Sequence, residues 1–322
     1  VAGRQTTWIV RLGERFSSGS FDGFGGSFGG RLAGAGHEVT FIARGAHLEA
    51  IRRDGLKLDS QIGALTVKPA MAVADPRDVA SPAEIIMFAT KLGDTERAAQ
   101  SLAPVVKDGT VIITFQNGID GADMIAKALP GAHVVPGVAR IASRISQPGV
   151  IEQRGQFAEI EFGAPDGRPN ARLEAFLAAC KGAGITASIS SDIRRSLWEK
   201  LAFLAPFSGM TTLTGHTAGP LRENPVTRGL IEDAVREAIA VARADGVSLR
   251  DDEFERRMKG FDSLPTAMTS SMAHDRNAGR PLEIGYLSGA VVRLGEKLGV
   301  PTPTHRFIVR ALAIDAGGRV TG

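Results

Sequence analysis

A glycine-rich segment, residues 23–30, is the first part of this sequence that suggests a chemical function, because it leads directly into a helical pattern. A glycine turn before a helix lets backbone N–H groups approach a pyrophosphate, with help from the helix dipole. The strict G-x-G-x-x-G pattern is absent, since Phe28 stands where the third glycine belongs. The alternative is a flexible loop with close helix–strand packing. Gly23, Gly25 and Gly26 are therefore candidate cofactor contacts.

Arg44 is the second candidate, and it follows an apolar run over residues 37–43. A dinucleotide with a free ribose 2′-hydroxyl usually needs an acidic residue at the end of this second strand. An arginine there favours a 2′-phosphate, and hence NADP. The alternative is a solvated loop arginine, which the residue taken alone favours.

Two further charged residues stand in helical patterns. Residues 193–204 carry an apolar stripe at helical spacing, and Lys200 falls on nearly the same face. A lysine directed inward needs an anionic partner or loses its proton, whereas a lysine that snorkels packs only its stem. Glu283 follows Pro281 in the first turn of an expected helix, where a glutamate also complements the helix dipole.

The elements that must position these residues divide the chain into two parts. Apolar runs that suit buried strands alternate with helical stretches up to about residue 190, and helical patterns predominate after it. The sequence therefore predicts an α/β fold: a Rossmann-type doubly wound sheet over 1–190, then an all-helical domain over 191–322. Two β-rich segments near residues 149–162 predict an antiparallel edge. The expected helices include 95–106, 193–207, 225–246, 251–259, 264–277, 281–298 and 304–316.

The first 22 residues are atypical of such a domain. Their compact apolar run, residues 8–10, is too short for a signal peptide and suits a short strand over residues 7–12. Residues 17–20 read as a loop.

Composition excludes several classes of protein. The 38 Lys and Arg exceed the 35 Asp and Glu by three and are scattered, which gives no case for nucleic acid. The absence of an apolar run of 18 residues predicts no membrane span. Cys180 is the only cysteine, which excludes a disulfide framework and fits a reducing compartment. The histidines are scattered and H-E-x-x-H is absent, so no metal site is predicted.

Taken in order, several short motifs resemble the ketopantoate reductase (2-dehydropantoate 2-reductase) family from about Gly23 to about Arg310. Their order and spacing are more specific than any one of them. The motifs are Gly29-Gly30-Arg31-Leu32-Ala33, the run 36–45, Thr90-Lys91, Gln116-Asn117-Gly118, Trp198-Glu199-Lys200, Ser270-Ser271-Met272, the run 278–286 and Gly299-Val300-Pro301-Thr302-Pro303.

The resemblance implies a cytosolic enzyme in which NADPH delivers hydride to the keto carbon of a 2-oxo acid. Lys200 matches the lysine that donates the proton to the forming alkoxide, and Glu283 matches the acid that hydrogen-bonds substrate and orients this lysine. Ser271 matches a contact to the substrate carboxylate. Asn117 matches an asparagine near the nicotinamide and the substrate.

On the cofactor side, Lys91 matches a lysine of the family, and Arg44 matches the 2′-phosphate arginine. The resemblance leaves a monomer or a homodimer open. It implies a small-molecule substrate, with no nucleic acid and no membrane.

The sequence departs from the family at the substrate end. Leu204 and Ser208 stand four and eight residues after the lysine, where the family often has asparagine; Ser208 stays a candidate substrate contact. Gly285 and Ser288 replace the usual Asp and Asn. The substrate is therefore 2-dehydropantoate or a related, more apolar 2-oxo acid.

The second departure concerns the phosphate loop. Aligned backward from Arg31, the family's G-x-G-x-x-G falls on residues 20–25, where only Gly25 keeps its glycine and Asp22 adds a carboxylate. Either the loop is shifted so that Gly23 and Gly25 approach the phosphates, with residues 8–12 as the strand, or the first 22 residues derive from a shifted reading frame.

Two other interpretations stay open. The first is a non-catalytic family member with a degenerate phosphate loop that acts as a binding or assembly module. The second is an opine-type or other 2-hydroxy acid dehydrogenase built on a similar two-domain plan.

Overall fold

The computed structural model describes the backbone of residues 7–11, 23–68 and 70–318, and the side chains from residue 23 onward. The chain forms two compact units. One comprises the chain up to Gln116 together with Gly121–Ile193, and the other comprises Asn117–Asp120 and Arg194–Gly322.

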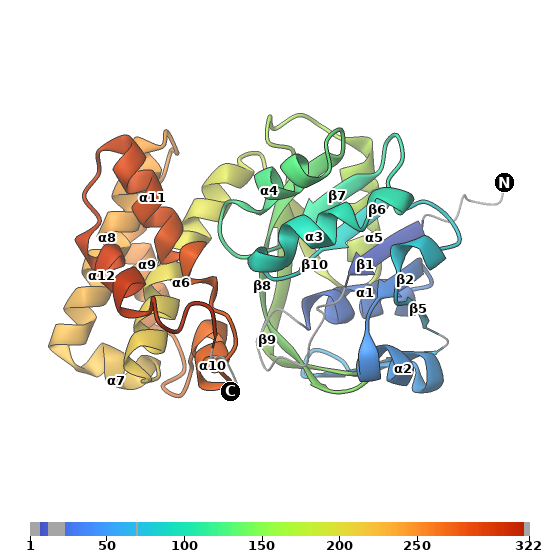
Figure 1. Ribbon diagram of the computed structural model, residues 1–322, viewed down its shortest axis with the longest axis horizontal. Coiled ribbons are helices and arrows are strands. Elements are labelled where there is room, and N and C mark those ends of the chain that lie inside the picture. The colour runs from blue at the N-terminus through green and yellow to red at the C-terminus, as the bar shows by residue number, and fades with distance from the viewer. Residues whose placement is uncertain (1–6, 12–22, 69, 319–322) are drawn as a thin grey trace. The chain divides into compact units, whose positions relative to one another are not determined.

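The described part of the first unit is built on a ten-stranded sheet (Figure 1). All the pairings among β5, β2, β1, β6, β7 and β8 are parallel, whereas β8 and β9 form a long antiparallel hairpin. The strands follow one another in the order β4 (Leu65–Val67), β3 (Leu56–Ser60), β9 (Val150–Phe162), β8 (His133–Gln147), β7 (Val111–Thr114), β6 (Ile85–Phe88), β1 (Thr7–Arg11), β2 (Glu38–Ile42) and β5 (Met71–Val73), and β10 (Thr186–Ile189) also pairs with β9.

This sheet confirms the predicted α/β class, with one correction. The antiparallel segment near residues 149–162 is not an edge of the sheet, because β9 has strands on both sides. It pairs with β8 on one side, and with β3 and β10 along different parts of the other. The strand expected over residues 7–12 is confirmed as β1, which pairs with β2 and β6 at the centre of the parallel part. The loop expected at residues 17–20 lies outside the described residues.

Successive residues of the central strands point to opposite faces, and both faces are buried. Phe41, Met87 and Ile113 belong to one hydrophobic core, whereas Ile86 and Ile112 belong to another. This burial explains why these strands read as continuous apolar runs.

Helix α1 (Phe24–Gly34) contacts β1 and β2 and also β8, β9, β3 and β4, so the sheet folds over this helix. Four glycines, the N-cap Gly23 and three within the helix, each face a different strand among β8, β9, β3 and β4. A Cβ added to any of them would come within 3 Å of an atom of that strand. The atoms nearest to such a Cβ are Arg144 N of β8 for Gly23, Ile151 Cγ1 of β9 for Gly26 (2.5 Å), Leu58 Cδ1 of β3 for Gly30 (2.6 Å) and Leu65 Cδ2 of β4 for Gly34 (2.9 Å).

The spacing of these glycines has a simple geometric cause. Steps of three or four residues advance a helix by roughly 4.5–6 Å, and neighbouring strands lie about 4.8 Å apart. One glycine therefore meets each successive strand. We refer to Gly23, Gly26, Gly30 and Gly34 as the glycine ladder.

The other helices of this unit are α2 (Gly45–Asp54), α3 (Thr95–Gln100), α4 (Gly121–Ala128) and α5 (Ala171–Gly182). The helix predicted over 95–106 is too long. It ends at Gln100 and is followed by a 3₁₀ turn at Ala103–Val105, because Pro104 disfavours helical geometry at the preceding residue and lacks a backbone N–H.

The second unit is helical as predicted (Figure 1). Among its described residues, no helix is long and apolar enough to cross a membrane, and the same holds for the first unit. The helices are α6 (Ile193–Thr214), α7 (Ala218–Glu223), α8 (Pro225–Ala244), α9 (Glu253–Asp262), α10 (Ser271–Asn277), α11 (Ser288–Leu298) and α12 (Pro303–Ala311).

Several predicted helix boundaries are wrong. Helix α6 continues past the expected end at residue 207, although it contains Pro206. The helix expected over 264–277 starts only at Ser271, because the side chain of Ser270 caps it by accepting a hydrogen bond from Ala273 N. Helix α12 ends at Ala311 rather than at residue 316.

The helix expected over 281–298 is also interrupted. Residues Glu283–Gly285 form a 3₁₀ turn, and α11 begins only at Ser288, since Leu287 adopts non-helical angles (φ −100°, ψ −96°). Glu283 consequently stands in a short turn, not in the first turn of a long helix.

Candidate functional site

In the first unit, the carboxyl ends of the parallel strands lie at one level. Arg11 of β1 aligns with Ile42 of β2 and with Phe88 of β6, which in turn aligns with Thr114 of β7. Ligands of open α/β sheets bind beyond these ends, at the point where the strand order reverses. Here the order reverses at β1, because the chain continues from β1 to β2 on one side and later to β6 on the other.

Two predicted cofactor residues follow these strand ends. Arg44 comes two residues after β2, is exposed, and directly precedes α2 without capping it through its side chain. Lys91 comes three residues after β6, is half-buried, and precedes a 3₁₀ turn at Leu92–Asp94. Both cations thus follow the carboxyl ends of the two strands that pair with β1, the region where a ligand of such a sheet binds.

Asp75 places a negative charge in the same neighbourhood, after β5. Hydrogen bonds from the Arg77 side chain and backbone lower the pKa of this carboxyl to about 2, and the charge of Arg44 contributes further. Sequence reasoning missed Asp75, because β5 has only three residues and gives no clear strand pattern.

The predicted glycine contacts are explained in part by packing. Gly23 and Gly26 belong to the glycine ladder and face strands β8 and β9. Gly25 is buried in the first turn of α1. Residues 20–22 of the expected phosphate loop lie outside the described residues, so a cofactor role for the three glycines stays a prediction.

A buried polar network joins the loops after β6 and β7, and sequence reasoning missed it. Gln116 Nε2 donates hydrogen bonds to the carbonyl of Thr90 (3.0 Å) and to Oγ1 of Thr95 (2.7 Å). Oε1 of Gln116 accepts from Oγ1 of Thr114 (2.9 Å). The network fixes the residues that directly precede Lys91 and Asn117. The Thr90-Lys91 and Gln116-Asn117 motifs were visible in the sequence. That Gln116 bonds to Thr90 becomes evident only once the fold brings the two motifs together.

Asn117 itself is buried with 4% exposure. Its Oδ1 accepts no hydrogen bond within the described part of the chain. The segment continues through Gly118, whose φ of 86° suits glycine, to Ile119, which packs on the core of the second unit. A buried amide oxygen without a donor is costly, and this makes Asn117 a good place for a ligand to donate a hydrogen bond.

In the second unit, α6 carries Lys200, Leu204 and Ser208 along one stripe. Lys200 is half-buried overall, but its Nζ atom is buried. Ser208 is 1% exposed. Its Oγ has no hydrogen-bond partner among the described residues, and the same is true of Oγ of Ser288 on α11.

The residues around this stripe pack closely. A Cβ added to Gly209 would lie 2.9 Å from Cγ2 of Ile308 and 3.4 Å from Oγ of Ser288. Glycine at this position therefore brings α6 near the start of α11. The hydroxyls of Ser208 and Ser288 are both buried in this helical core, and each is a candidate for a hydrogen bond to a ligand.

Two predicted residues stand on neighbouring segments of the same unit. Ser271 is the half-buried first residue of α10, and Oγ of the preceding Ser270 accepts a hydrogen bond from Oγ1 of Thr211 on α6 (2.8 Å). Ser270 is thus a helix cap tied to α6, not a back-bonding hydroxyl inside a helix. Glu283 is half-buried in its 3₁₀ turn.

A shared core brings these segments together. Residues next to Asn117, Lys200, Ser271 and Glu283 all pack on the same hydrophobic cluster of the second unit: Ile119, Trp198, Leu201, Met272, Leu282 and Ile284. Among the residues that the structure describes, no group of three or more His, Cys, Asp or Glu is arranged to hold a metal ion.

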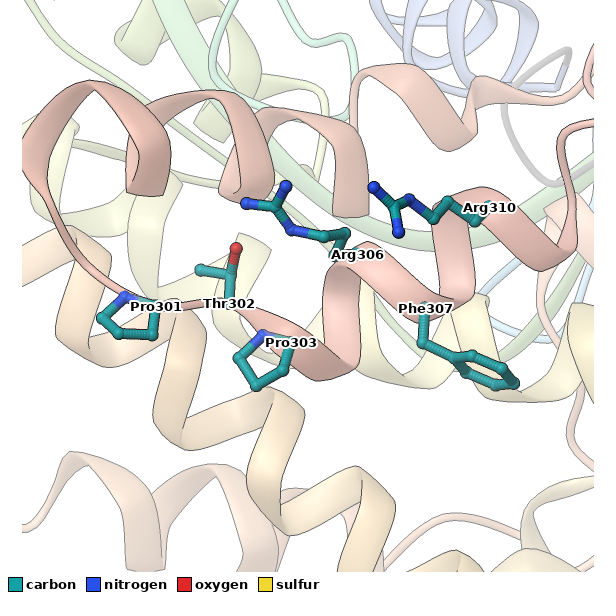
Figure 2. A pocket seen from close by; sticks show the side chains of 6 residues that line it. All are labelled: Pro301, Thr302, Pro303, Arg306, Phe307 and Arg310. Carbon is teal, nitrogen blue, oxygen red and sulfur yellow. The ribbon is translucent and has the colours of Figure 1, made fainter.

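A hollow of about 390 Å³ lies elsewhere in the second unit, lined by residues of α12 and the segment before it. Figure 2 shows Arg306 and Arg310 on one side of α12, with Phe307 pointing away from them. Arg306 also pairs with Glu296 (3.0 Å). None of the predicted site residues lines this hollow.

Comparison with known proteins decides the family. Residues 22–167 match the family profile "Ketopantoate reductase PanE/ApbA", and residues 192–314 match "Ketopantoate reductase PanE/ApbA C terminal". The chain belongs to the ketopantoate reductase PanE/ApbA family. This is a family of oxidoreductases that use a nicotinamide cofactor. The family predicted from the motifs is confirmed.

Relatives resemble the chain over most of its length. The 2-dehydropantoate 2-reductases of Halobacterium salinarum and Mesorhizobium japonicum are each 30% identical, over 88% and 91% of this chain and 93% and 96% of their own. A PanE/ApbA family ketopantoate reductase from Ralstonia eutropha has a TM-score of 0.85 at 29% identity, covering 96% of this chain and 98% of that one. A D-mandelate dehydrogenase with NADH and anilino(oxo)acetate (TM-score 0.83, 21% identity, covering 96% and 98%) shares the fold.

Proposed function

We propose that this protein reduces the keto group of a 2-oxo acid to the 2-hydroxy acid with NADPH. The substrate is 2-dehydropantoate or a related, more apolar acid. The buried Nζ of Lys200, on a stripe of α6 with the buried hydroxyl of Ser208, is the observation that carries the proposal. A lysine is kept inside a helical core at a cost in solvation, and such costs concentrate at functional sites.

The cofactor fits the residues present. The exposed Arg44 suits a 2′-phosphate, and Lys91 suits the anionic backbone of a dinucleotide. Gly23, Gly25 and Gly26 stand at the start of α1, the end of a helix that attracts anions. Oδ1 of Asn117 is a buried acceptor ready for an amide or hydroxyl donor. The bound cofactor supplies the hydride for the carbonyl carbon.

The chain's own residues supply the proton and the orientation. Lys200 holds a proton at Nζ, donates it to the carbonyl oxygen, and stabilises the negative charge that develops on this oxygen. Glu283 accepts a hydrogen bond from the new hydroxyl and orients Lys200. Ser271 donates to the substrate carboxylate, and Ser208 contacts the remainder of the substrate.

The apolar character of the substrate follows from Leu204. This residue lies one helical turn beyond Lys200 and packs partly on the hydrophobic core. A leucine cannot satisfy a buried substrate hydroxyl, and leaving such a group unpaired costs about 1–3 kcal/mol. A 2-oxo acid with an alkyl end therefore suits this stripe better than one with a hydroxyl there.

Titration of the full chain with NADPH, followed by fluorescence and run in parallel with NADH, is the first test. We expect saturable NADPH binding that is at least about tenfold tighter than NADH binding. Arg44→Gln should weaken NADPH binding by about tenfold and leave NADH binding unchanged, since only NADPH carries the 2′-phosphate. No binding of either cofactor at millimolar concentration would instead favour a non-catalytic family member.

The role of Lys200 is tested by turnover. Lys200→Ala should lower kcat with a 2-oxo acid by about a thousandfold or more, while NADPH still binds with unchanged affinity. An equal loss of turnover and of cofactor binding would assign Lys200 to the framework and contradict the proposed mechanism.

A further inference from the structure

A buried charge pair on α9 lies directly behind the segment that carries Lys200. Glu253, the first residue of α9, is 0% exposed, and its Oε1 lies 2.7 Å from Nε of Arg257, one turn later. Arg257 is only 17% exposed at its side chain. Such a pair usually contributes little net stability, because both charges lose their hydration. A role other than stabilising the fold would explain a buried charge pair at this position.

The second contact of Arg257 supplies that reason. Its Nη1 donates a hydrogen bond to the backbone carbonyl of Glu199 in α6 (3.0 Å). That carbonyl belongs to the peptide bond joining Glu199 to Lys200. Arg257 therefore holds the peptide plane from which the Lys200 backbone continues.

Helix α9 follows α6 beyond this contact. A Cβ added to Gly260 would lie 3.7 Å from the ring of Phe203, and the rings of Phe207 and Phe261 meet edge to face at 6.4 Å. Residues 199, 203 and 207 thus form the stripe of α6 that faces α9. The stripe of residues 200, 204 and 208 lies next to it, one residue further along the helix.

The charges around Glu253 explain why the arginine is needed. Burial raises the pKa of the Glu253 carboxyl, and the positive charge of Arg257 opposes this rise. Glu199 also adds a repulsive charge, and its own side chain is within 3.7 Å of Arg195. The charge of Glu253 therefore attracts the guanidinium of Arg257, although the two groups are not in hydrogen-bond geometry, and Arg257 in turn donates its hydrogen bond to α6.

We propose that Glu253 and Arg257 are positioning residues for Lys200, fixing the peptide bond that precedes it and hence the direction of its side chain. This inference rests on the proposed function, in which Lys200 is the proton donor. A displacement of about 1 Å at a catalytic group is enough to lower a rate by about a hundredfold.

The experiment compares two arginines of the same helical unit in the full-length protein. Arg257→Met removes the bond to α6. The matched control is Arg228→Met, which removes a bidentate pair with Asp262 at the other end of α9 (2.6 and 3.1 Å) without touching α6. We expect Arg257→Met to lower kcat about 10- to 100-fold at unchanged NADPH affinity. Arg228→Met should change kcat less than about twofold.

The conservative variant separates positioning from general stability. Arg257→Lys keeps one donor for the Glu199 carbonyl and a charge for Glu253, so we expect kcat to recover at least about threefold over Arg257→Met. If Arg257→Met fails to fold, Arg257→Lys and Glu253→Gln are compared instead. Both should then lower kcat without changing NADPH affinity.

Hydrogen exchange provides a readout that needs no substrate. Amides of residues 198–204 should exchange faster in Arg257→Met than in the parent chain, whereas Arg228→Met should leave them unchanged. If the parent chain reduces no 2-oxo acid, the proposed function fails, and exchange alone decides the positioning role. Equal effects of the two arginine variants on kcat and on exchange, or no effect of Arg257→Met, would overturn the proposal.

Discussion

Helix α1 of the first unit and helix α6 of the second both lie within a core, yet they bury different atoms. Helix α1 meets four strands through the glycine ladder, where an added Cβ would force the facing atoms to shift, most severely at Gly23, which faces strand backbone. Helix α6 instead buries the amine of Lys200 and the hydroxyl of Ser208. The first helix packs through glycines that alternate with large apolar side chains such as Phe24 and Phe28, whereas the second carries polar groups that a core normally excludes.

This difference predicts opposite responses to mutation. Atoms added at the glycine ladder force the facing side chain or backbone to shift, so we expect them to cost stability whatever their chemistry. Changes on the stripe of α6 that conserve volume leave the fold intact and alter chemistry instead. We therefore expect substitutions at the glycines of α1 mainly to lower stability, and substitutions on the stripe of α6 mainly to alter activity.

The largest effect is expected on α1. Gly26→Val places a branched side chain where even a Cβ lies 2.5 Å from Ile151, and we expect a loss of about 3 kcal/mol in the free energy of unfolding. Denaturant unfolding measures this loss. Ile151→Ala in the same chain should recover part of it, and strictly additive losses would contradict the packing explanation.

Cys180 offers a way to assign that loss to the first unit. The thiol is buried in the same core as Phe24 and Phe28, and burial raises its pKa to about 12. It should therefore resist alkylation until this unit opens. Gly26→Val should speed its modification, and substitutions on α6 should not.

The next effect concerns pH and again belongs to the first unit. Burial lowers the pKa of His47 to about 4, and its Nδ1 accepts a hydrogen bond from Gly149 N (3.0 Å). Because the unfolded chain titrates near pH 6.5, it binds the proton first. Stability should be full above that pH and fall by up to about 3 kcal/mol as the pH drops toward 4.

His47→Gln serves as the control for this pH dependence. Its side-chain oxygen can accept from Gly149 N but does not titrate. Stability curves measured between pH 4 and 8 should therefore be flatter for this variant, and an unchanged slope would assign the dependence to other groups.

The smallest effect is expected on the stripe of α6. Leu204→Asn should change stability by less than about 1.5 kcal/mol, because Leu204 is only partly buried and the two side chains have the same number of heavy atoms. It should shift the kcat/KM ratio toward 2-dehydropantoate over 3-methyl-2-oxobutanoate by about tenfold. A loss of stability as large as that of Gly26→Val, without a change in this ratio, would remove the contrast between the helices.

The sequence was most informative where a pattern is local. Apolar runs predicted the strands at the centre of the sheet, including β1, and helical spacing predicted most of the helices in the second unit. Predicted helix boundaries were wrong where a single contact sets them. At Ser270, for example, the side chain accepts a hydrogen bond from Ala273 N and so fixes the start of α10. Lys200 and Glu283 were predicted as site residues because their motifs are contiguous, and their roles stay predictions.

Contacts between distant segments could not be predicted. The glycines of α1 were visible in the sequence, but their partners come from four strands far along the chain. The Gln116 network and the bond from Arg257 to Glu199 likewise join residues separated by 26 and 58 positions. Neither glutamine nor arginine carries a local pattern that indicates such a bond.

The glycine ladder has a consequence beyond this chain. Glycines at intervals of three, four and four residues form a pattern that depends on strand spacing and not on phosphate chemistry. In this chain packing against β8, β9, β3 and β4 accounts for the four glycines with or without a bound nucleotide. The interval is therefore a pattern to look for in other sheets that fold over their first helix.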